Sequence, residues 1–285
     1  MFLIIGLVLC IGSILGGFIM HGGNLGALIQ PSEFIIIGGA ALFSFVAANS
    51  PATVKAFIPG IIHCLKGSGV SKETFKQLLG LMAEIFNVIR KEGVLGIEGD
   101  ISNPHESARF KKYPAVLHNH HLVELFVGAL RLFVDGVVNA FDLERLMDAE
   151  VEAHHEEAHT LPAAVKNMAD ALPAFGIVAA VLGVILTMQY LDQPPTVIGQ
   201  KVAAALVGTM LGIYLSYGLV GPIASAMENI VKEEAGLYKC VQAGLVAFAG
   251  GSPPQVALEF ARKTIPPFYR PTSEELEQII KASKS

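Results

Sequence analysis

One long apolar stretch, Leu172 to Pro222, constrains this chain more than any other feature. Between Leu172 and Leu191 the only ionisable side chain is Tyr190. In the return arm, which begins at Val202, the only ionisable side chains are those of Tyr214 and Tyr217. A helix needs about 20 apolar residues to cross the roughly 30 Å hydrocarbon core of a bilayer. Each arm meets that length, and the polar turn between them is short. The sequence therefore predicts two transmembrane helices that form a hairpin.

Two further apolar segments precede this hairpin. Met1 to Met20 carries no charge, and it has neither the basic start nor the cleavage site of a signal peptide, so we expect a membrane helix that is retained. Phe34 to Ala48 is the second apolar span. A short glycine-rich loop joins the two segments, which gives four expected spans in all.

The rest of the chain indicates helices in water. The composition, 52% hydrophobic and 16% charged, lies between that of soluble and membrane chains. Charges reappear after residue 50, and apolar residues recur at helical spacing over Lys72–Glu92 and over the acidic segment Phe141–His159. No strand-like alternation appears. The fold class predicted is an all-α integral membrane protein with four transmembrane helices and a helical cytoplasmic domain.

Four parts follow from these patterns. We expect transmembrane helices 1 and 2 with a short periplasmic loop over residues 1–50, and a cytoplasmic helical domain over residues 51–167. Transmembrane helices 3 and 4 are expected over residues 168–226, and a cytoplasmic helical tail over residues 227–285.

The distribution of Lys and Arg predicts the orientation of the spans. Residues 51–167 carry 12 of these residues and residues 225–285 carry 7, whereas the short loops 21–33 and 192–200 carry none. Positive residues stay on the cytoplasmic side of a membrane. Both termini are therefore expected in the cytoplasm.

The net charge of −5 argues against nucleic acid as a partner, because phosphates require a basic face. The three cysteines, Cys10, Cys64 and Cys240, are far apart and give no disulfide or metal spacing. We expect no cofactor and no catalytic residue.

An ionisable side chain deep in the membrane is the usual sign of an ion path. Here Glu33, Asp170 and Lys201 are expected at the edges of spans, and the span centres have no such group. The hairpin offers hydroxyls such as that of Thr209, and small residues against which another helix can pack closely. These small residues are Gly176, Ala179, Ala180, Gly183, Gly208 and Gly212. If the chain transports ions, a partner helix must supply the titrating group.

Two histidine motifs allow a metal interpretation. His155 and His159 match H-E-x-x-H, the pattern of zinc proteases. The flanking residues are charged, Pro162 is expected to end the helix, and a third ligand is lacking. A solvated acidic helix is the alternative. The histidines at 118, 120 and 121 are interpreted in the same way, as a surface helix start rather than a metal site.

Four other residues are candidates for function. Arg90 and Glu98 flank a break at Gly93–Gly96, where they are either a binding pair or ordinary solvated charges. Pro173 and Pro222 fall at the cytoplasmic ends of spans 3 and 4, as plain helix punctuation or as a hinge at matching depths.

At these positions the chain resembles the MotA family of flagellar stator proteins, within the MotA/TolQ/ExbB proton channel superfamily. The resemblance covers nearly the whole length. It is carried by the run Leu172–Gly183, by Val207-Gly208-Thr209, by Gly218 with Pro222, and by Glu259-Phe260-x-Arg262-Lys263.

The resemblance implies a stator subunit of the bacterial flagellar motor, in the inner membrane. Arg90 and Glu98 match the family's contacts with the rotor protein FliG, Pro173 and Pro222 its functional prolines, and Thr209 its channel-facing threonine. It further implies a homopentamer, surrounded by lipid, around two copies of MotB, whose single helix brings the proton-binding aspartate. Sodium-driven relatives have threonine where this chain has Ala180, which favours protons as the coupling ion.

Three alternatives remain at this point. An energy transducer similar to ExbB or TolQ has three spans. A membrane zinc protease uses His155 and His159. A passive scaffold carries no ion flux.

Overall fold

The computed structural model describes residues 2–283, and this part of the chain contains helices and no strand. The chain divides into two compact units. The membrane unit comprises the chain up to Gly67 together with Glu157–Ile230, and the globular unit comprises Ser68–Glu156 together with the chain from Val231 onward. Two long helices, α10 (Ala140–Thr187) and α12 (Gly221–Ala249), contribute residues to both units.

Four helical segments of the chain are long and apolar enough to cross a membrane, as the sequence predicts. The first is α1 (Phe2–Met20), and the second begins at a short 3-10 turn, η1 (Leu25–Leu28). That second segment continues through α2 (Pro31–Phe34), the π-helical η2 (Ile35–Gly39) and α3 (Ala40–Ala48). An amphipathic helix, α4 (Pro51–Lys66), follows it.

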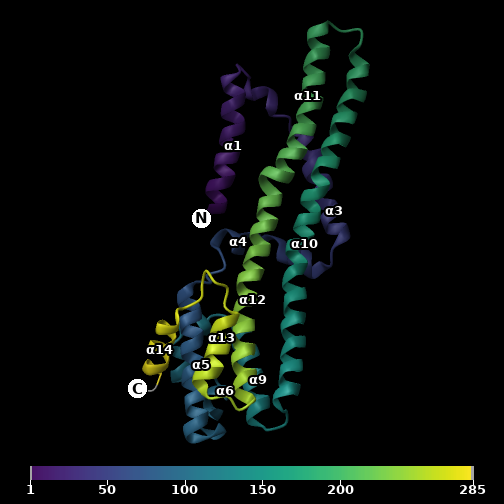
Figure 1. Cartoon of the computed structure of the whole chain (residues 1–285). Helices are drawn as coiled ribbons and strands as arrows, with labels where there is room; N and C mark the ends of the chain where they lie inside the picture. Colours follow the sequence, from purple (N-terminus) through teal and green to yellow (C-terminus); the bar gives the residue numbers. More distant parts are fainter. Residues whose placement is uncertain (1, 284–285) are drawn as a thin grey trace. The chain divides into compact units, whose positions relative to one another are not determined.

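The expected hairpin is formed by α10 and α11 (Pro195–Ile213), which lie side by side in Figure 1. The turn between them includes the 3-10 segment η4 (Met188–Tyr190). Past α11 the helix continues through a π-helical segment, η5 (Tyr214–Val220), into α12.

Two prolines lie inside α10 without ending it. Pro162 was expected to end the acidic helix, and that expectation is wrong, because the helix runs through both Pro162 and Pro173 to Thr187. A proline removes one backbone hydrogen bond, and a long helix that packs on neighbours tolerates the loss.

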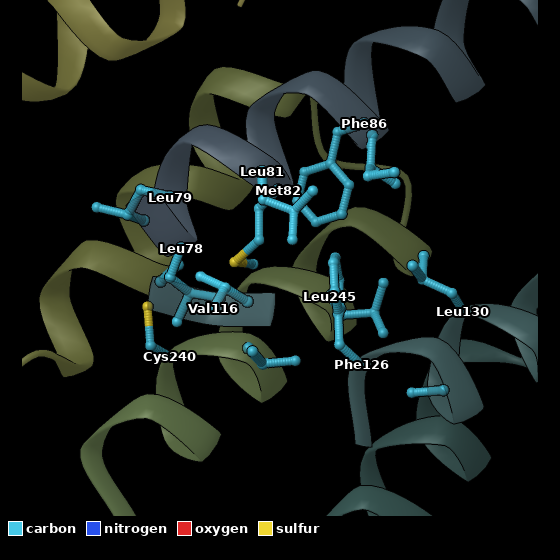
Figure 2. Close-up of a cluster of buried hydrophobic side chains, with 14 of the residues drawn as sticks. Leu78, Leu79, Leu81, Met82, Phe86, Val116, Phe126, Leu130, Cys240 and Leu245 are labelled. Atoms are coloured by element: carbon cyan, nitrogen blue, oxygen red, sulfur yellow. The ribbon is translucent and has the colours of Figure 1, made fainter. Parts of the chain in front are cut away.

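The globular unit is built on α5 (Lys72–Glu92), whose bounds equal the predicted ones. Its side chains pack with those of α9 (His120–Val134) and α12, as Figure 2 shows. Leu143, Met147 and Val151 of α10 belong to the same core. The rings of Phe86 and Phe248 stack with centroids 4.2 Å apart. The remaining helices are η3 (Val94–Ile97), α6 (Glu98–Ser102), α7 (Ala108–Lys111), α8 (Pro114–Leu117), α13 (Pro254–Thr264) and α14 (Ser273–Ala282).

Candidate functional site

Glycines bring the two arms of the hairpin into backbone contact. A Cβ atom placed on Gly176 would lie 3.0 Å from the carbonyl oxygen of Gly208. A Cβ on Gly212 would lie 2.8 Å from the Cα of Gly176, and one on Gly183 would lie 2.6 Å from the Cβ of Ala205. Only residues without side chains allow this distance. The small residues that the sequence offers to another helix are therefore used, in large part, within the hairpin itself.

Thr209 and Ala180 lie on this closely packed hairpin. Both are half-buried, and the carbonyl oxygen of Thr209 would lie 3.4 Å from a Cβ atom on Gly176. Their neighbours Gly208 and Ala179 are buried. Each of the two residues therefore keeps part of its surface open in the single chain.

The two prolines are not at the same level of the hairpin, which corrects the expectation of matching depths. A Cβ on Gly212 would lie 2.8 Å from the carbonyl oxygen of Leu172, so Pro173 is level with that part of α11. Pro222 follows about 15 Å further along the helix axis. A single bend across both arms is therefore not built into the fold.

Pro222 instead follows a change in backbone hydrogen bonding. The N–H of Gly221 donates to the carbonyl of Ser216, five residues earlier, and not to the carbonyl four residues earlier. A Cβ on Gly221 would lie 2.8 Å from that same oxygen, so the bond requires glycine. A proline cannot donate and its ring collides with the preceding turn, which favours such a bulge. The hydroxyl of Ser216 is buried, and no hydrogen-bond partner for it is found among residues 2–283.

Glu33 does not lie at the edge of its unit. Its side chain is 6% exposed, and it packs beside Gly208, about 20 Å along the axis of α11 from Pro195. The reason is that η1 and α2 both pack against α11, so the second span begins partway along the hairpin. The sequence carries a weak signal for this, since Glu33 follows Pro31 in the first turn of an apolar helix.

Arg90 and Glu98 are exposed on the globular unit. Arg90 is in the last turn of α5, and Glu98 begins α6. Gly93 ends α5 with φ = 76°, a conformation that favours glycine, and a Cβ on Gly96 would lie 2.9 Å from a methyl carbon of Val88. Among residues 2–283, neither charged side chain has a hydrogen bond or ion pair, so both are available to a partner.

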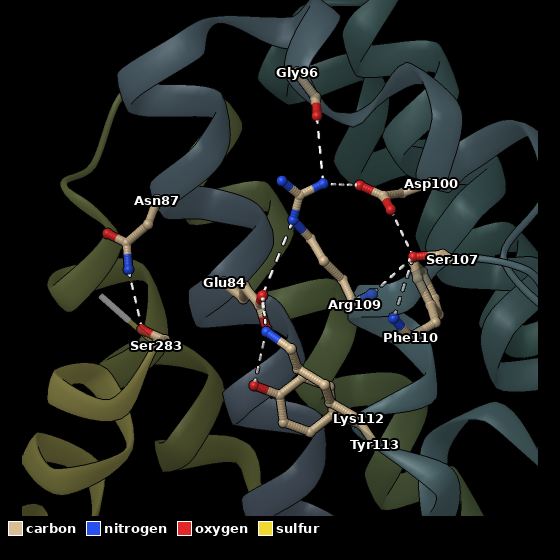
Figure 3. A network of polar contacts seen from close by, with 10 residues as sticks. All are labelled: Glu84, Asn87, Gly96, Asp100, Ser107, Arg109, Phe110, Lys112, Tyr113 and Ser283. Atoms are coloured by element: carbon tan, nitrogen blue, oxygen red, sulfur yellow. Dashed lines mark hydrogen bonds and ion pairs between the residues drawn. The ribbon is translucent and has the colours of Figure 1, made fainter. Parts of the chain in front are cut away.

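A polar network holds the segment that carries Glu98 (Figure 3). The guanidinium of Arg109 donates to the carboxylate of Asp100 and to the carbonyl of Gly96, the latter at 3.5 Å. It also lies 4.0 Å from the carboxylate of Glu84 on α5. Ser107 donates to the other oxygen of Asp100 at 2.5 Å. Arg109 thus ties the start of α6 to α5, a role that no sequence pattern indicated.

Glu84 is the second centre of this network. It accepts from Lys112 at 2.7 Å and from the hydroxyl of Tyr113 at 3.2 Å. Burial, together with the charge and hydrogen bond of Glu84, raises the pKa of Tyr113 well above its usual range. Tyr113 therefore remains a neutral donor at all physiological pH values.

The histidine motifs do not form a ligand set. Within the described residues, no group of three or more His, Cys, Asp or Glu side chains is placed to hold a metal ion. His155 and His159 lie one turn apart on α10, and the ring of His159 is 3.9 Å from the carboxylate of Glu228. Catalytic zinc sites need three protein ligands.

These features define a class, the multi-pass, all-helical membrane proteins. The family described as "Motility protein A N-terminal" matches residues 4–93, and the "MotA/TolQ/ExbB proton channel family" matches residues 118–239. Motility protein A of Salmonella typhimurium is 37% identical over 285 residues, covering 100% of this chain and 97% of its own length. The chain therefore belongs to the motility protein A family, a proton channel family of the bacterial inner membrane and not an enzyme family.

Other relatives agree. Motility protein A of Escherichia coli is also 37% identical over 100% of this chain and 97% of its own length, and the chemotaxis protein LafT of Vibrio parahaemolyticus is 35% identical over 96% of each. Two solved structures have the same fold, each at 23% sequence identity. That of Campylobacter jejuni, "Structure of C. jejuni MotAB", has a TM-score of 0.78 and covers 93% of this chain and 95% of its own. The flagellar MotAB stator complex from Bacillus subtilis has a TM-score of 0.76, and the match covers 94% of this chain and 97% of that one.

Proposed function

We propose that this chain is the membrane subunit of a flagellar stator, which forms a proton-conducting complex with a MotB-type partner and converts ion flow into torque. One observation carries the proposal: the α10–α11 hairpin is packed through glycines and leaves Thr209 and Ala180 half-exposed. Full-length similarity to motility protein A supports it. The chain acts as a channel subunit and catalyses no bond chemistry.

The partner supplies an aspartate that binds the proton, and five copies of this chain surround two copies of the partner, with lipid outside. Both termini and the globular unit lie in the cytoplasm, in agreement with the distribution of Lys and Arg. Co-purification with a single-span, acidic partner tests the assembly. A chain that purifies alone and leaks protons at full rate by itself would refute it.

Arg90 and Glu98 contact the rotor protein FliG. They are exposed on the globular unit, and Arg109 and Gly96 hold the segment beside them. Reversing Arg90 to Glu is expected to abolish most torque, and a charge reversal on the rotor is expected to restore part of it. Because the contact is between exposed charges, torque should also weaken with ionic strength. Torque unchanged by Arg90→Glu, measured on tethered cells, would remove this role.

Ala180 sets the coupling ion. An alanine provides no hydroxyl with which to replace the water shell of a sodium ion, whereas protons need no such cage. Pro173 and Pro222 allow changes at the hairpin to reach the rest of their helices. Swimming speed that follows external sodium at constant pH would contradict proton coupling.

An energy transducer of the ExbB or TolQ type belongs to the same proton channel family. Four candidate spans and the match of residues 4–93 to a motility-specific family favour the stator. Cysteine labelling of the loops on intact cells counts the spans directly. A three-span result would favour the transducer instead.

A further inference from the structure

Glu33 is a carboxyl group that the packing of this one chain already buries. It lies in the first turn of a continuous helical stretch from Pro31 to Ala48. Its side chain is 6% exposed in the single chain, so assembly with other chains only buries it further. Its Oε2 atom is buried and has no hydrogen-bond partner among the described residues. Such groups are rare, because an unpaired buried polar atom is costly.

A missing side chain creates the space for this carboxyl group. A Cβ atom on Gly208 would lie 2.5 Å from Oε2 of Glu33 and 3.2 Å from the Cβ of Ala179. The carboxyl thus occupies the gap that a glycine of α11 leaves open, against α10. The next residue along α11 is Thr209. The geometry places an acid of this chain one residue along α11 from the threonine that the proposed function puts on the ion path.

Two opposing effects act on the charge of this group. Burial without a partner favours the neutral acid. The dipole of the helix, whose first turn contains this residue, favours the carboxylate. When such effects oppose each other, the two protonation states differ less in free energy than either effect alone would make them. A group of this kind can bind a proton and release it.

The other ionisable groups around Glu33 are few. On α11 the only one is Lys201, about 10 Å along the axis from the gap. Its Nζ lies 4.8 Å from the centre of the Tyr190 ring in η4, and Tyr190 is the only ionisable side chain between residues 172 and 191. Further along α10, Asp170 faces Lys166 at 3.7 Å. The segments η1 and η2 carry no ionisable side chain.

We propose that Glu33 is a proton-binding site of this chain, which takes up and releases a proton in the Gly208 gap during ion flow. The inference rests on the proposed stator function. On uptake, a hydronium ion gives a proton to Oε2, which leaves a water molecule and a neutral carboxylic acid. On release, that O–H bond breaks and the proton passes to the carboxylate of the partner. No other bond changes.

Infrared spectroscopy tests the proton directly. The complex of the full chain with its co-purified partner is placed in lipid vesicles, and wild type is compared with Glu33→Gln while pH is varied. The expected difference is a protonated-carboxyl stretching band that is present in wild type, absent in the variant, and lost as pH rises. Identical spectra, or a difference band that never changes with pH, would overturn the proposal. Neither result bears on rotor torque, so the stator function would stand.

Proton uptake by the same vesicles tests the role in flow. Glu33→Gln keeps the shape of the side chain but cannot titrate, and it is expected to lower the uptake rate at least tenfold. Glu33→Asp is expected to retain part of the rate with a shifted pH profile. Asp192→Asn, which alters an exposed carboxylate in the hairpin turn, serves as the control and should match wild type. Full uptake in Glu33→Gln, or equal loss of assembly in both Glu33 variants, would rule out a titrating role.

A paired substitution tests the gap itself. Gly208→Ala places a methyl group where the carboxyl lies, so the thermal stability of the complex should fall. Adding Glu33→Ala frees that space and should restore part of the loss. Gly183→Ala also crowds the hairpin, against Ala205, and should not be rescued by Glu33→Ala. Equal rescue of both glycine variants, or of neither, would overturn the placement.

Discussion

Replacing Arg109 with alanine tests whether the polar network positions Glu98. The guanidinium is 28% exposed, and its partners Asp100 and Glu84 are 10% and 13% exposed. Without it, Asp100 keeps the Ser107 hydroxyl as its hydrogen-bond partner, and the carbonyl of Gly96 loses its donor. The segment that carries Glu98 is then held against α5 by packing alone, through Gly96 and through the buried side chains of Ile97 and Ile101.

The expected magnitude follows from burial. Hydrogen bonds to charged groups contribute about 1.5–3 kcal/mol when they are shielded, and exposed pairs contribute about 0–1 kcal/mol. For a partly buried guanidinium we expect a loss of about 2 kcal/mol, or roughly a 30-fold change in the local opening equilibrium. Lys112→Ala is the matched control, because Lys112 pairs with the same Glu84 carboxylate but is 59% exposed. Its effect should stay below about fivefold.

Amide hydrogen exchange of residues 97–103 measures that opening in the assembled complex. Torque on tethered cells and proton uptake by vesicles are measured with the same two variants. Arg109→Ala should raise exchange about 30-fold and lower torque with proton uptake unchanged. If Arg109→Ala raises exchange by less than fivefold, the polar network does not hold the segment that carries Glu98. If exchange rises while torque stays at the wild-type level, the position of Glu98 does not matter to the rotor.

Three further predictions concern stability. Gly212→Ala should lower the thermal stability of the complex by about 1–3 kcal/mol through overpacking, whereas Gly199→Ala, which meets no atom within 4 Å, should not lower it. Lys72 and Lys76 of α5 and the backbone N–H of Thr272 lower the pKa of Glu275 from 4.5 to about 2. Docking of α14 is therefore stabilised above pH 4.5, and the stabilisation is lost as pH falls toward 2. Amide hydrogen exchange in α14 should show this pH dependence, and Glu275→Gln should lack it. Arg262→Ala removes two bonds to Glu259 and one to a backbone carbonyl, and should cost about 2 kcal/mol, measured as exchange in α13.

The sequence predicts what periodicity and length control. The four spans and the bounds of α5 are confirmed, because apolar runs and amphipathic spacing are strong local signals. The predicted end of a helix at Pro162 is wrong, because local propensity cannot show that a helix will continue through a proline when it packs on neighbouring helices.

Tertiary contacts account for what the sequence does not show. Glu33 is close in sequence to a polar loop, and only the packing of α2 against Gly208 reveals that it is buried. The bonds from Arg109 to Asp100 and to Gly96 join residues whose spacing matches no motif. Glu33 and Arg109 are both polar residues whose role depends on which helix packs beside them.

The two prolines act differently, because only one is accompanied by a change in hydrogen bonding. At Pro173 the α-helix is uninterrupted, whereas before Pro222 the N–H of Gly221 bonds to the carbonyl of Ser216 in a π-helical turn. A π turn can move along a helix by exchanging one acceptor for another without breaking the helix. A shift of packing near Gly208 can therefore reach α12 through this turn, whereas α10 transmits it as one continuous helix. If so, substitutions at Gly221 should uncouple ion flow from torque more strongly than substitutions at Pro173.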